Sequence, residues 1–102
     1  MTMKALRFAS TGQMADVLHL EDVPVPQIDD NSVLVHVKAS AINPSDCKNI
    51  AGAFPQTTLP RTPGRDFAGI VVDGPSDLVG KKVWGTGGDY GYTRDGMHAE
   101  YV

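Results

Sequence analysis

The stretch that decides the fold is residues 41–69, AINPSDCKNIAGAFPQTTLPRTPGRDFAG. Its first part predicts a short helix, because Pro44 suits the first helical position, where its missing N–H costs nothing. Asn43, just before it, is a preferred N-cap residue, and Asp46 lies in the first turn, where the helix dipole favours a carboxylate. Gly52 is typical of the position after a helix end. The segment therefore predicts one short helix that gathers polar groups at its start.

The apolar runs on both sides of this helix are short and separated by turn signals, which predicts strands. The strongest is 33–42, because it is rich in β-branched residues and partly alternating, and it leads directly into Asn43. Gly69 marks a point in a strand where backbone or a ligand comes close. We expect strands at residues 3–9, 17–23, 33–42 and 67–72, from residue 82, and at 97–102. The pattern predicts a mostly β partial barrel with one short helix, as one domain over residues 1–102.

Composition and charge exclude several classes of protein. The 102 residues are 41% hydrophobic and 21% charged, which indicates a globular domain rather than a disordered chain. The net charge is −3 and no Lys/Arg block exists, so we expect neither a nucleic acid nor a membrane as partner. The N-terminus MTMKALRF has no long apolar run, so we expect no signal peptide and a cytoplasmic location. Cys47 is the only cysteine, which excludes an intrachain disulfide.

Two motifs, INPSD at 42–46 and TPGRDFAG at 62–69, resemble the medium-chain dehydrogenase/reductase superfamily. Together they are most similar to its zinc-independent quinone oxidoreductase and enoyl reductase branch, and the resemblance runs from MKALRF to HAEYV. It implies an N-terminal GroES-like catalytic domain, which is followed in such proteins by a Rossmann domain that binds NADPH. It also implies hydride transfer to a quinone or another α,β-unsaturated carbonyl.

Residue chemistry argues against zinc in this region. Zinc-dependent members of the superfamily carry a cysteine at the position of Asn43 and a Gly-His-Glu motif at Gly64-Arg65-Asp66. Zinc needs thiolate, imidazole or carboxylate donors. Asparagine is a poor ligand, and arginine cannot bind zinc because it stays protonated. We therefore expect no zinc, and we expect NADPH as the cofactor that the resemblance implies.

The resemblance also suggests catalytic roles for Asn43, Asp46 and Arg65. Asp46 and Arg65 align with positions that approach each other near the metal in zinc-dependent relatives, so a charge-assisted pair could fill the vacated place. Arg65 or Asn43 would then polarise a substrate carbonyl. The alternative is that these residues form a structural ion pair and a helix cap, and Asp66 is interpreted as structural.

Three further residues are candidates for ligand contact. Phe54 stands near the position where some enoyl reductases of this branch carry a tyrosine. Phenylalanine cannot donate a proton, so Phe54 would line the nicotinamide pocket or simply pack in a loop. Tyr90 would line the substrate cleft or only cover it. Lys48 would approach cofactor phosphate or substrate, or remain an exposed helix lysine.

The remaining motifs are weaker. Residues 85–91, GTGGDYG, lack the last glycine of G-x-G-x-x-G and precede no helix pattern, so we interpret 85–96 as a mobile loop rather than a phosphate site. His19, His36 and His98 form no ligand motif, and ordinary surface or core roles are expected for them. Cys47 lies near a helix start, which favours a reactive thiolate, and a small buried residue is the alternative.

The sequence thus predicts the N-terminal catalytic domain of a zinc-independent, NADPH-dependent quinone or enone oxidoreductase. Its partners would be that small-molecule substrate and a C-terminal Rossmann domain, and a homodimer of the full-length protein is left open. The domain alone is expected to be inactive, because it lacks the dinucleotide fingerprint. The alternatives are a non-enzymatic GroES-like interaction module and a zinc-type alcohol dehydrogenase that has lost its metal.

Overall fold

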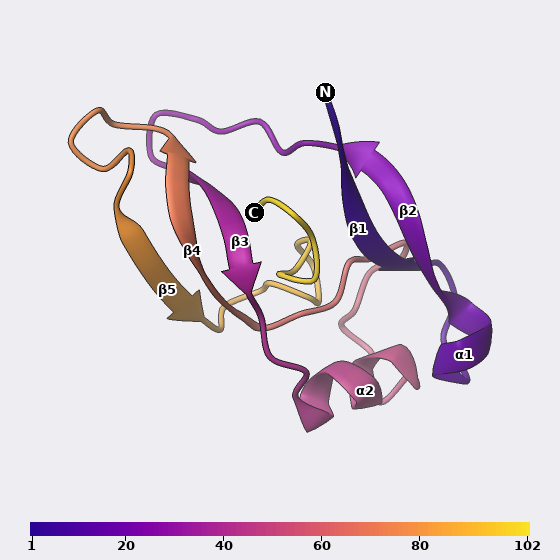
Figure 1. The fold of residues 1–102 in the computed structure, drawn as a ribbon. Coiled ribbons are helices and arrows are strands. Elements are labelled where there is room, and N and C mark those ends of the chain that lie inside the picture. The colour runs from indigo at the N-terminus through magenta and orange to yellow at the C-terminus, as the bar shows by residue number, and fades with distance from the viewer.

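The computed structural model describes all residues 1–102 as five strands and two short helices. In chain order they are β1 (Thr2–Phe8), α1 (Met14–Val17), β2 (Leu18–Pro24), β3 (Leu34–Ala39), α2 (Pro44–Ile50), β4 (Asp66–Asp73) and β5 (Lys82–Thr86) (Figure 1). β1 and β2 form one antiparallel sheet, and β3, β4 and β5 form a second. The predicted mostly β fold is confirmed. The expectation of a single helix was wrong, because the four residues MADV form α1 before β2.

Residues 97–102, here called the closing segment, join the two sheets. On one side the Leu6 N–H donates to the His98 carbonyl at 2.9 Å, and on the other the Val37 N–H donates to the Glu100 carbonyl at 2.8 Å. Figure 1 shows this end of the chain, in yellow, between β1 and β3. We expected a regular strand here, but the segment changes partner near Glu100 and forms only isolated bridges to each sheet. Backbone hydrogen bonds therefore close the partial barrel.

The core is built from both sheets, α2 and the closing segment. Its buried apolar side chains include Phe8, Val35, Ile50, Val71 and Met97. Val35 lies opposite Val71 in the pairing of β3 with β4. β3 contributes to the core only in part, because the register shifts after Val37 and Ala39 is exposed.

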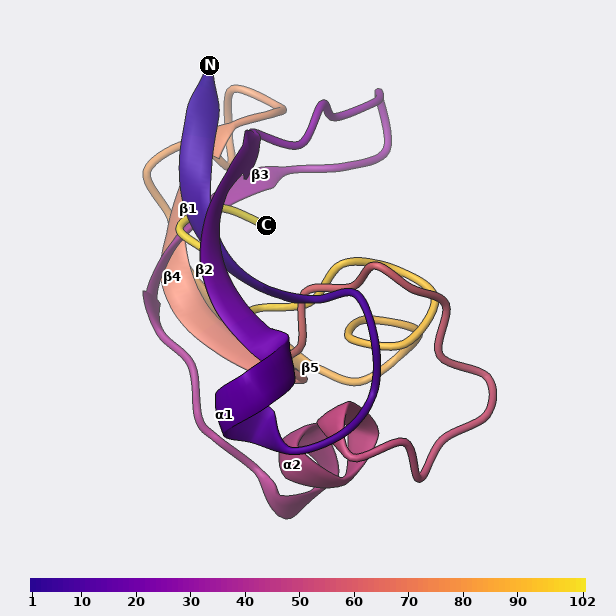
Figure 2. The same cartoon turned by 90° about the vertical axis from the view of Figure 1, so that its right-hand side faces the viewer.

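The close backbone approach predicted at Gly69 is confirmed, since a Cβ atom there would collide with the His36 carbonyl oxygen. Both helices lie at the same end of the molecule, where β3 leads into α2 (Figure 2). Neither helix has the length and apolar character needed to cross a membrane. The fold thus places the start of α2 at one end of the three-stranded sheet.

Candidate functional site

The turn between β3 and α2 is held by two carboxylates. Asn43 is the N-cap of α2, as predicted, and Asp46 accepts a hydrogen bond from the Asn43 backbone N–H at 2.8 Å. The Asn43 side chain also faces the Asp46 backbone N–H, which completes the arrangement called a capping box, although these two groups do not form a hydrogen bond. Asp66 accepts from the Ala41 backbone N–H at 2.8 Å and from the Asn43 side-chain amide at 2.9 Å. Asn43 is thus fixed through both its backbone and its side chain.

His98 reaches the same turn from the closing segment. Its Nε2 lies 2.9 Å from the Ala41 carbonyl oxygen and 3.9 Å from Asp46 Oδ2. The side chains of His98 and Asp46 are 9% and 3% exposed, so both are shielded from solvent. Sequence reasoning missed His98, because it lies 57 residues from Ala41 and belongs to no motif of its own. We refer to Asn43, Asp46, Asp66 and His98 together as the Asn43 cluster.

Hydrogen bonding inside the cluster favours an ionised Asp66. The bond from the Asn43 side chain, followed by the bond from the Ala41 N–H, holds the pKa of Asp66 below its ordinary value. The charge of His98 adds to the lowering, and burial opposes it. Asp66 therefore serves as an anionic acceptor that orients the Asn43 amide.

Arg65 does not form the expected pair with Asp46. Its Nη1 donates to the carbonyl oxygens of Gly88 at 2.7 Å and Tyr90 at 2.9 Å. Its guanidinium carbon also lies 4.4 Å from the centre of the Tyr92 ring, a cation–π distance. The pair prediction was wrong because the glycine-rich loop offers Arg65 backbone acceptors, while Asp46 faces His98 and the start of α2.

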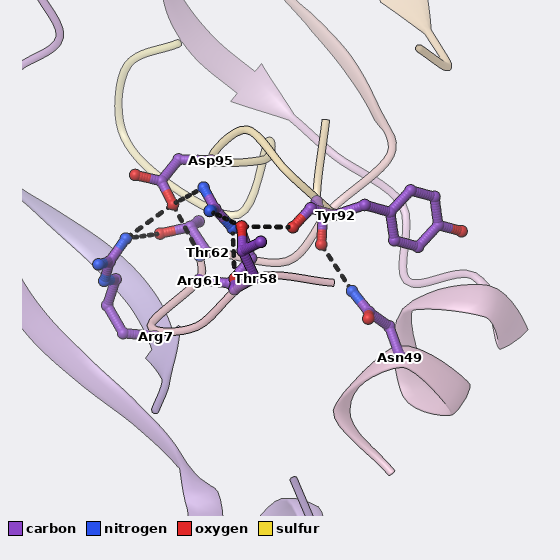
Figure 3. A network of polar contacts seen from close by, with 8 residues as sticks. Arg7, Asn49, Thr58, Arg61, Thr62, Tyr92 and Asp95 are labelled. Carbon is purple, nitrogen blue, oxygen red and sulfur yellow. Dashed lines mark hydrogen bonds and ion pairs between the residues drawn. The ribbon is translucent and has the colours of Figure 1, made fainter. Parts of the chain in front are cut away.

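The loop 85–96 is anchored at several points along its length. Besides the contacts of Arg65, the Asn49 side-chain amide donates to the Gly91 carbonyl at 2.6 Å, and the Thr58 N–H donates to the Tyr92 carbonyl at 3.0 Å (Figure 3). A non-enzymatic interaction module would need a mobile loop that binds its partner. These hydrogen bonds hold the loop against the domain and so argue against that alternative.

A second polar network lies at the end of this loop and is centred on Asp95. Its Oδ1 accepts from Arg7 Nη1 at 2.8 Å, from Arg61 Nη1 at 3.1 Å and from the Thr62 N–H at 3.1 Å (Figure 3). Arg61 also donates through Nε to the Thr58 carbonyl at 2.9 Å. We call these residues the Asp95 network. It ties β1 to two loops on its side of the barrel.

An apolar pocket of about 490 Å³ opens beside the Asn43 cluster. Asp46, Cys47 and His98 contribute to its lining, and most of the other lining residues are apolar. Apolar pockets with a few convergent polar groups are the usual form of small-molecule sites. The arrangement brings a fixed amide, two carboxylates and an imidazole together, and one of these carboxylates, Asp46, lines the pocket with His98.

The sequence model of the alcohol dehydrogenase GroES-like domain matches residues 29–102. The chain belongs to this family. The predicted resemblance to medium-chain dehydrogenases/reductases is confirmed at this level, whereas the branch within the superfamily stays a prediction.

Among curated relatives, the GroES-like domain is 46% identical over 101 residues to the zinc-type alcohol dehydrogenase-like protein C337.11 of Schizosaccharomyces pombe, covering 97% of this chain and 31% of that protein. It is 43% identical over 83 residues to the 2-methylene-furan-3-one reductase of Solanum lycopersicum, covering 78% of this chain and 21% of the relative. The chain therefore spans about a third or less of the length of these proteins.

Solved structures give the same result. The quinone oxidoreductase from Coxiella burnetii matches with a TM-score of 0.85 and 34% identity, covering 100% of this chain and 34% of that one. A putative NADPH:quinone reductase from Bacillus thuringiensis matches with a TM-score of 0.87 and 34% identity, covering 100% of this chain and 30% of that one. Both comparisons support the GroES-like fold.

The donor set of this GroES-like domain does not fit a catalytic zinc. No group of three or more His, Cys, Asp or Glu side chains is arranged to hold a metal ion. Asn43 turns its amide nitrogen, a donor, towards Asp66, and Arg65 is bonded to backbone carbonyls. The Arg65 guanidinium has no lone pair for zinc, and the Asn43 amide is a poor zinc ligand.

The other predicted ligand-contact residues of the GroES-like domain lie away from the pocket. Phe54 packs edge-on against Tyr92 with ring centres 5.2 Å apart. Tyr90 stacks with the Arg94 guanidinium at 4.6 Å and lines a separate hollow. Lys48 is exposed on α2. The structure does not bring these three residues together with the Asn43 cluster, and their contacts with substrate or cofactor stay predictions.

Proposed function

We propose that this GroES-like domain is the N-terminal catalytic domain of a zinc-independent, NADPH-dependent oxidoreductase that reduces quinones or other α,β-unsaturated carbonyl compounds. The observation that carries the proposal is the Asn43 side-chain amide, which Asp66 holds at 2.9 Å. It stands where zinc-dependent relatives have a cysteine ligand. The names of the tomato reductase and of the Coxiella quinone oxidoreductase support the substrate class.

The chemistry follows from the donors of the Asn43 amide. A carboxamide has two N–H hydrogens, of which Asp66 accepts one, and no residue of the chain accepts the other. The second hydrogen is free to bind a substrate carbonyl oxygen, and polarising that carbonyl makes the β-carbon a better hydride acceptor. NADPH, when bound, supplies the hydride, and a proton must reach the α-carbon of an enone, or the oxygen of a quinone, to complete the reduction.

Residues 1–102 contain no G-x-G-x-x-G fingerprint, so NADPH would be held mainly by a Rossmann domain that lies outside them. The greater length of the relatives supports this view. We expect the isolated chain to bind NADPH weakly or not at all, and calorimetric titration showing micromolar affinity would contradict it. The cytoplasmic location and the homodimer are further parts of the proposal.

A chimera tests the function directly. This chain would replace the matching N-terminal region of the Schizosaccharomyces pombe relative, which shares 46% identity over 101 residues. We expect the chimera to oxidise NADPH with a quinone or an alkenal, and to retain no stoichiometric zinc after dialysis. One zinc per chain together with oxidation of a primary alcohol would overturn the proposal in favour of a zinc-type dehydrogenase.

Substitution of Asn43 tests the observation that carries the proposal. Removing one such donor typically lowers kcat by roughly 10²–10³-fold, and we expect a loss of this size in the Asn43→Ala chimera. Asn31→Ala, at an exposed asparagine in a turn, is the matched control and should leave kcat unchanged. Equal rates in both variants would show that Asn43 does not polarise the substrate.

A further inference from the structure

His98 occupies a shielded position that depends on the TPGRD motif. Gly64 has φ +110°, and a Cβ atom there would lie 2.6 Å from the His98 backbone nitrogen and 2.9 Å from its Cδ2. The absence of a side chain at Gly64 therefore lets the imidazole approach the start of β4. The His98 N–H also donates to the Pro63 carbonyl at 3.0 Å, which fixes the backbone of the residue.

The hydrogen on the imidazole can be assigned from its partners. Nε2 lies 2.9 Å from the Ala41 carbonyl oxygen, and a carbonyl only accepts hydrogen bonds. Nε2 must therefore carry a hydrogen, in the neutral and in the charged form of the ring alike. The same nitrogen lies 3.9 Å from Asp46 Oδ2, beyond hydrogen-bond distance, so the Ala41 carbonyl is the acceptor of this hydrogen.

His98 thereby completes a clamp on the turn that presents Asn43. Asp66 holds the Ala41 N–H and the Asn43 side chain, Asp46 holds the Asn43 N–H, and His98 holds the Ala41 carbonyl. Only His98 comes from outside the segment 41–66. It links the turn to the closing segment and hence to β1, whose Leu6 N–H donates to the His98 carbonyl at 2.9 Å.

We propose that His98 is a positioning residue of the candidate site, which orients the Asn43 amide by holding the Ala41 carbonyl. It acts through Asn43 and need not touch the substrate. The kinetic consequence rests on the proposed function, whereas the structural consequence for Asn43 does not.

Nuclear magnetic resonance on the 102-residue chain tests the structural consequence. In His98→Phe the ring volume is kept and the donor is lost, so the Asn43 side-chain amide should shift and exchange its hydrogens on the order of tenfold faster, as expected when one supporting hydrogen bond is removed. His98→Gln places an N–H near the former Nε2 and should restore the wild-type signal. His36→Phe is the control, because His36 stacks on Tyr101 at 4.9 Å within the sheet.

The chimera tests the kinetic consequence. We expect His98→Phe to lower kcat about tenfold with little change in KM, and His98→Gln to recover most of it. A role in stability alone would lower the melting temperature without this division between kcat and KM. An inactive wild-type chimera would contradict the proposed function and leave the resonance test standing. An Asn43 amide that is unchanged in His98→Phe would overturn the inference.

Discussion

The Asn43 cluster and the Asp95 network are both polar, yet they are built in opposite ways. In the Asn43 cluster two carboxylates accept hydrogens from one short turn, and the buried Asp46 has His98 as its nearest basic group. In the Asp95 network two arginine side chains, 16% and 13% exposed, share a single carboxylate oxygen on a half-exposed aspartate. In the first, each donor has an acceptor oxygen of its own, whereas in the second three donors share one oxygen.

The different use of donors and acceptors suits the Asn43 cluster and the Asp95 network to different roles. The acceptors of the Asn43 cluster orient a neutral amide and leave one of its hydrogens unused, and Asp46 and His98 of the cluster line an apolar pocket. Arg61 of the Asp95 network donates to Asp95, to the Thr58 carbonyl and to the Thr58 hydroxyl, so three of its five N–H donors hold loops together. We therefore expect changes at Asp95 to act on stability and changes at Asn43 to act on catalysis.

The largest expected effect is at Gly64, on which the position of His98 depends. Gly64→Ala forces alanine into a positive φ, which costs about 1–2 kcal/mol, and drives a Cβ into the His98 backbone, which adds about 1–3 kcal/mol. Gly80→Ala is the matched control, because Gly80 has φ +89° with nothing within 4 Å of the added Cβ. Denaturant unfolding should show a clearly larger loss for Gly64→Ala. Equal losses would mean that the approach of His98 is not tight.

The next effect concerns the Asp95 network. Asp95→Ala leaves two largely buried guanidinium groups without their carboxylate, and we expect unfolding free energy to fall by about 1–3 kcal/mol. Asp22→Ala removes an ion pair of 2.7 Å with Lys4 whose side chains are 58% and 60% exposed, and should cost less than about 1 kcal/mol. A similar cost for both would remove the distinction between the network and an ordinary surface pair.

A double-mutant cycle tests the separation of Asp46 from Arg65. Because Arg65 binds the carbonyls of Gly88 and Tyr90, the effects of Asp46→Asn and Arg65→Gln on unfolding free energy should add within about 0.5 kcal/mol. Coupling well above that value would indicate that Asp46 and Arg65 interact, as the sequence predicted, and that Arg65 belongs to the Asn43 cluster.

The smallest effect is the pH dependence contributed by Asp66. Its folded-state pKa lies below the ordinary value of 3.8, so its stabilisation is complete above that pH and is lost as the pH falls through the folded-state pKa. Unfolding of the wild type and Asp66→Asn should therefore differ most near neutral pH and converge in acid. Asn43→Ala removes the largest cause of the lowering, so in that background the difference should be smaller and its loss should be complete at a higher pH. A constant difference down to the most acidic pH would contradict the assignment.

Local signals predicted the unit that carries the site. Proline at the first helical position, an N-cap asparagine and a β-branched run before them were enough to place β3 and α2, because each signal acts within a few residues. α1 escaped prediction, since its four residues follow Gln13, which makes no side-chain cap.

Long-range contacts were not predictable in the same way. Arg65 donates to backbone carbonyls of an irregular loop. Every residue has a backbone carbonyl, so the sequence does not indicate which of them will accept a hydrogen bond. His98 meets Ala41 across 57 residues, and only the fold of the closing segment brings them together. Three of the four residues of the Asn43 cluster were therefore accessible to sequence reasoning, because Asn43, Asp46 and Asp66 lie in motifs, whereas His98 depends on barrel closure.

The closing segment also sets the order of events during synthesis. β1, β2 and the three strands of the second sheet are all made before residues 97–102, although Lys4 is bonded to Glu100, 96 residues away along the chain. Contacts between such distant residues form late, because the long intervening loop must close first. A newborn chain therefore passes through an interval in which β1 and β3 lack their hydrogen bonds to the closing segment. Unpaired strand edges of this kind favour aggregation.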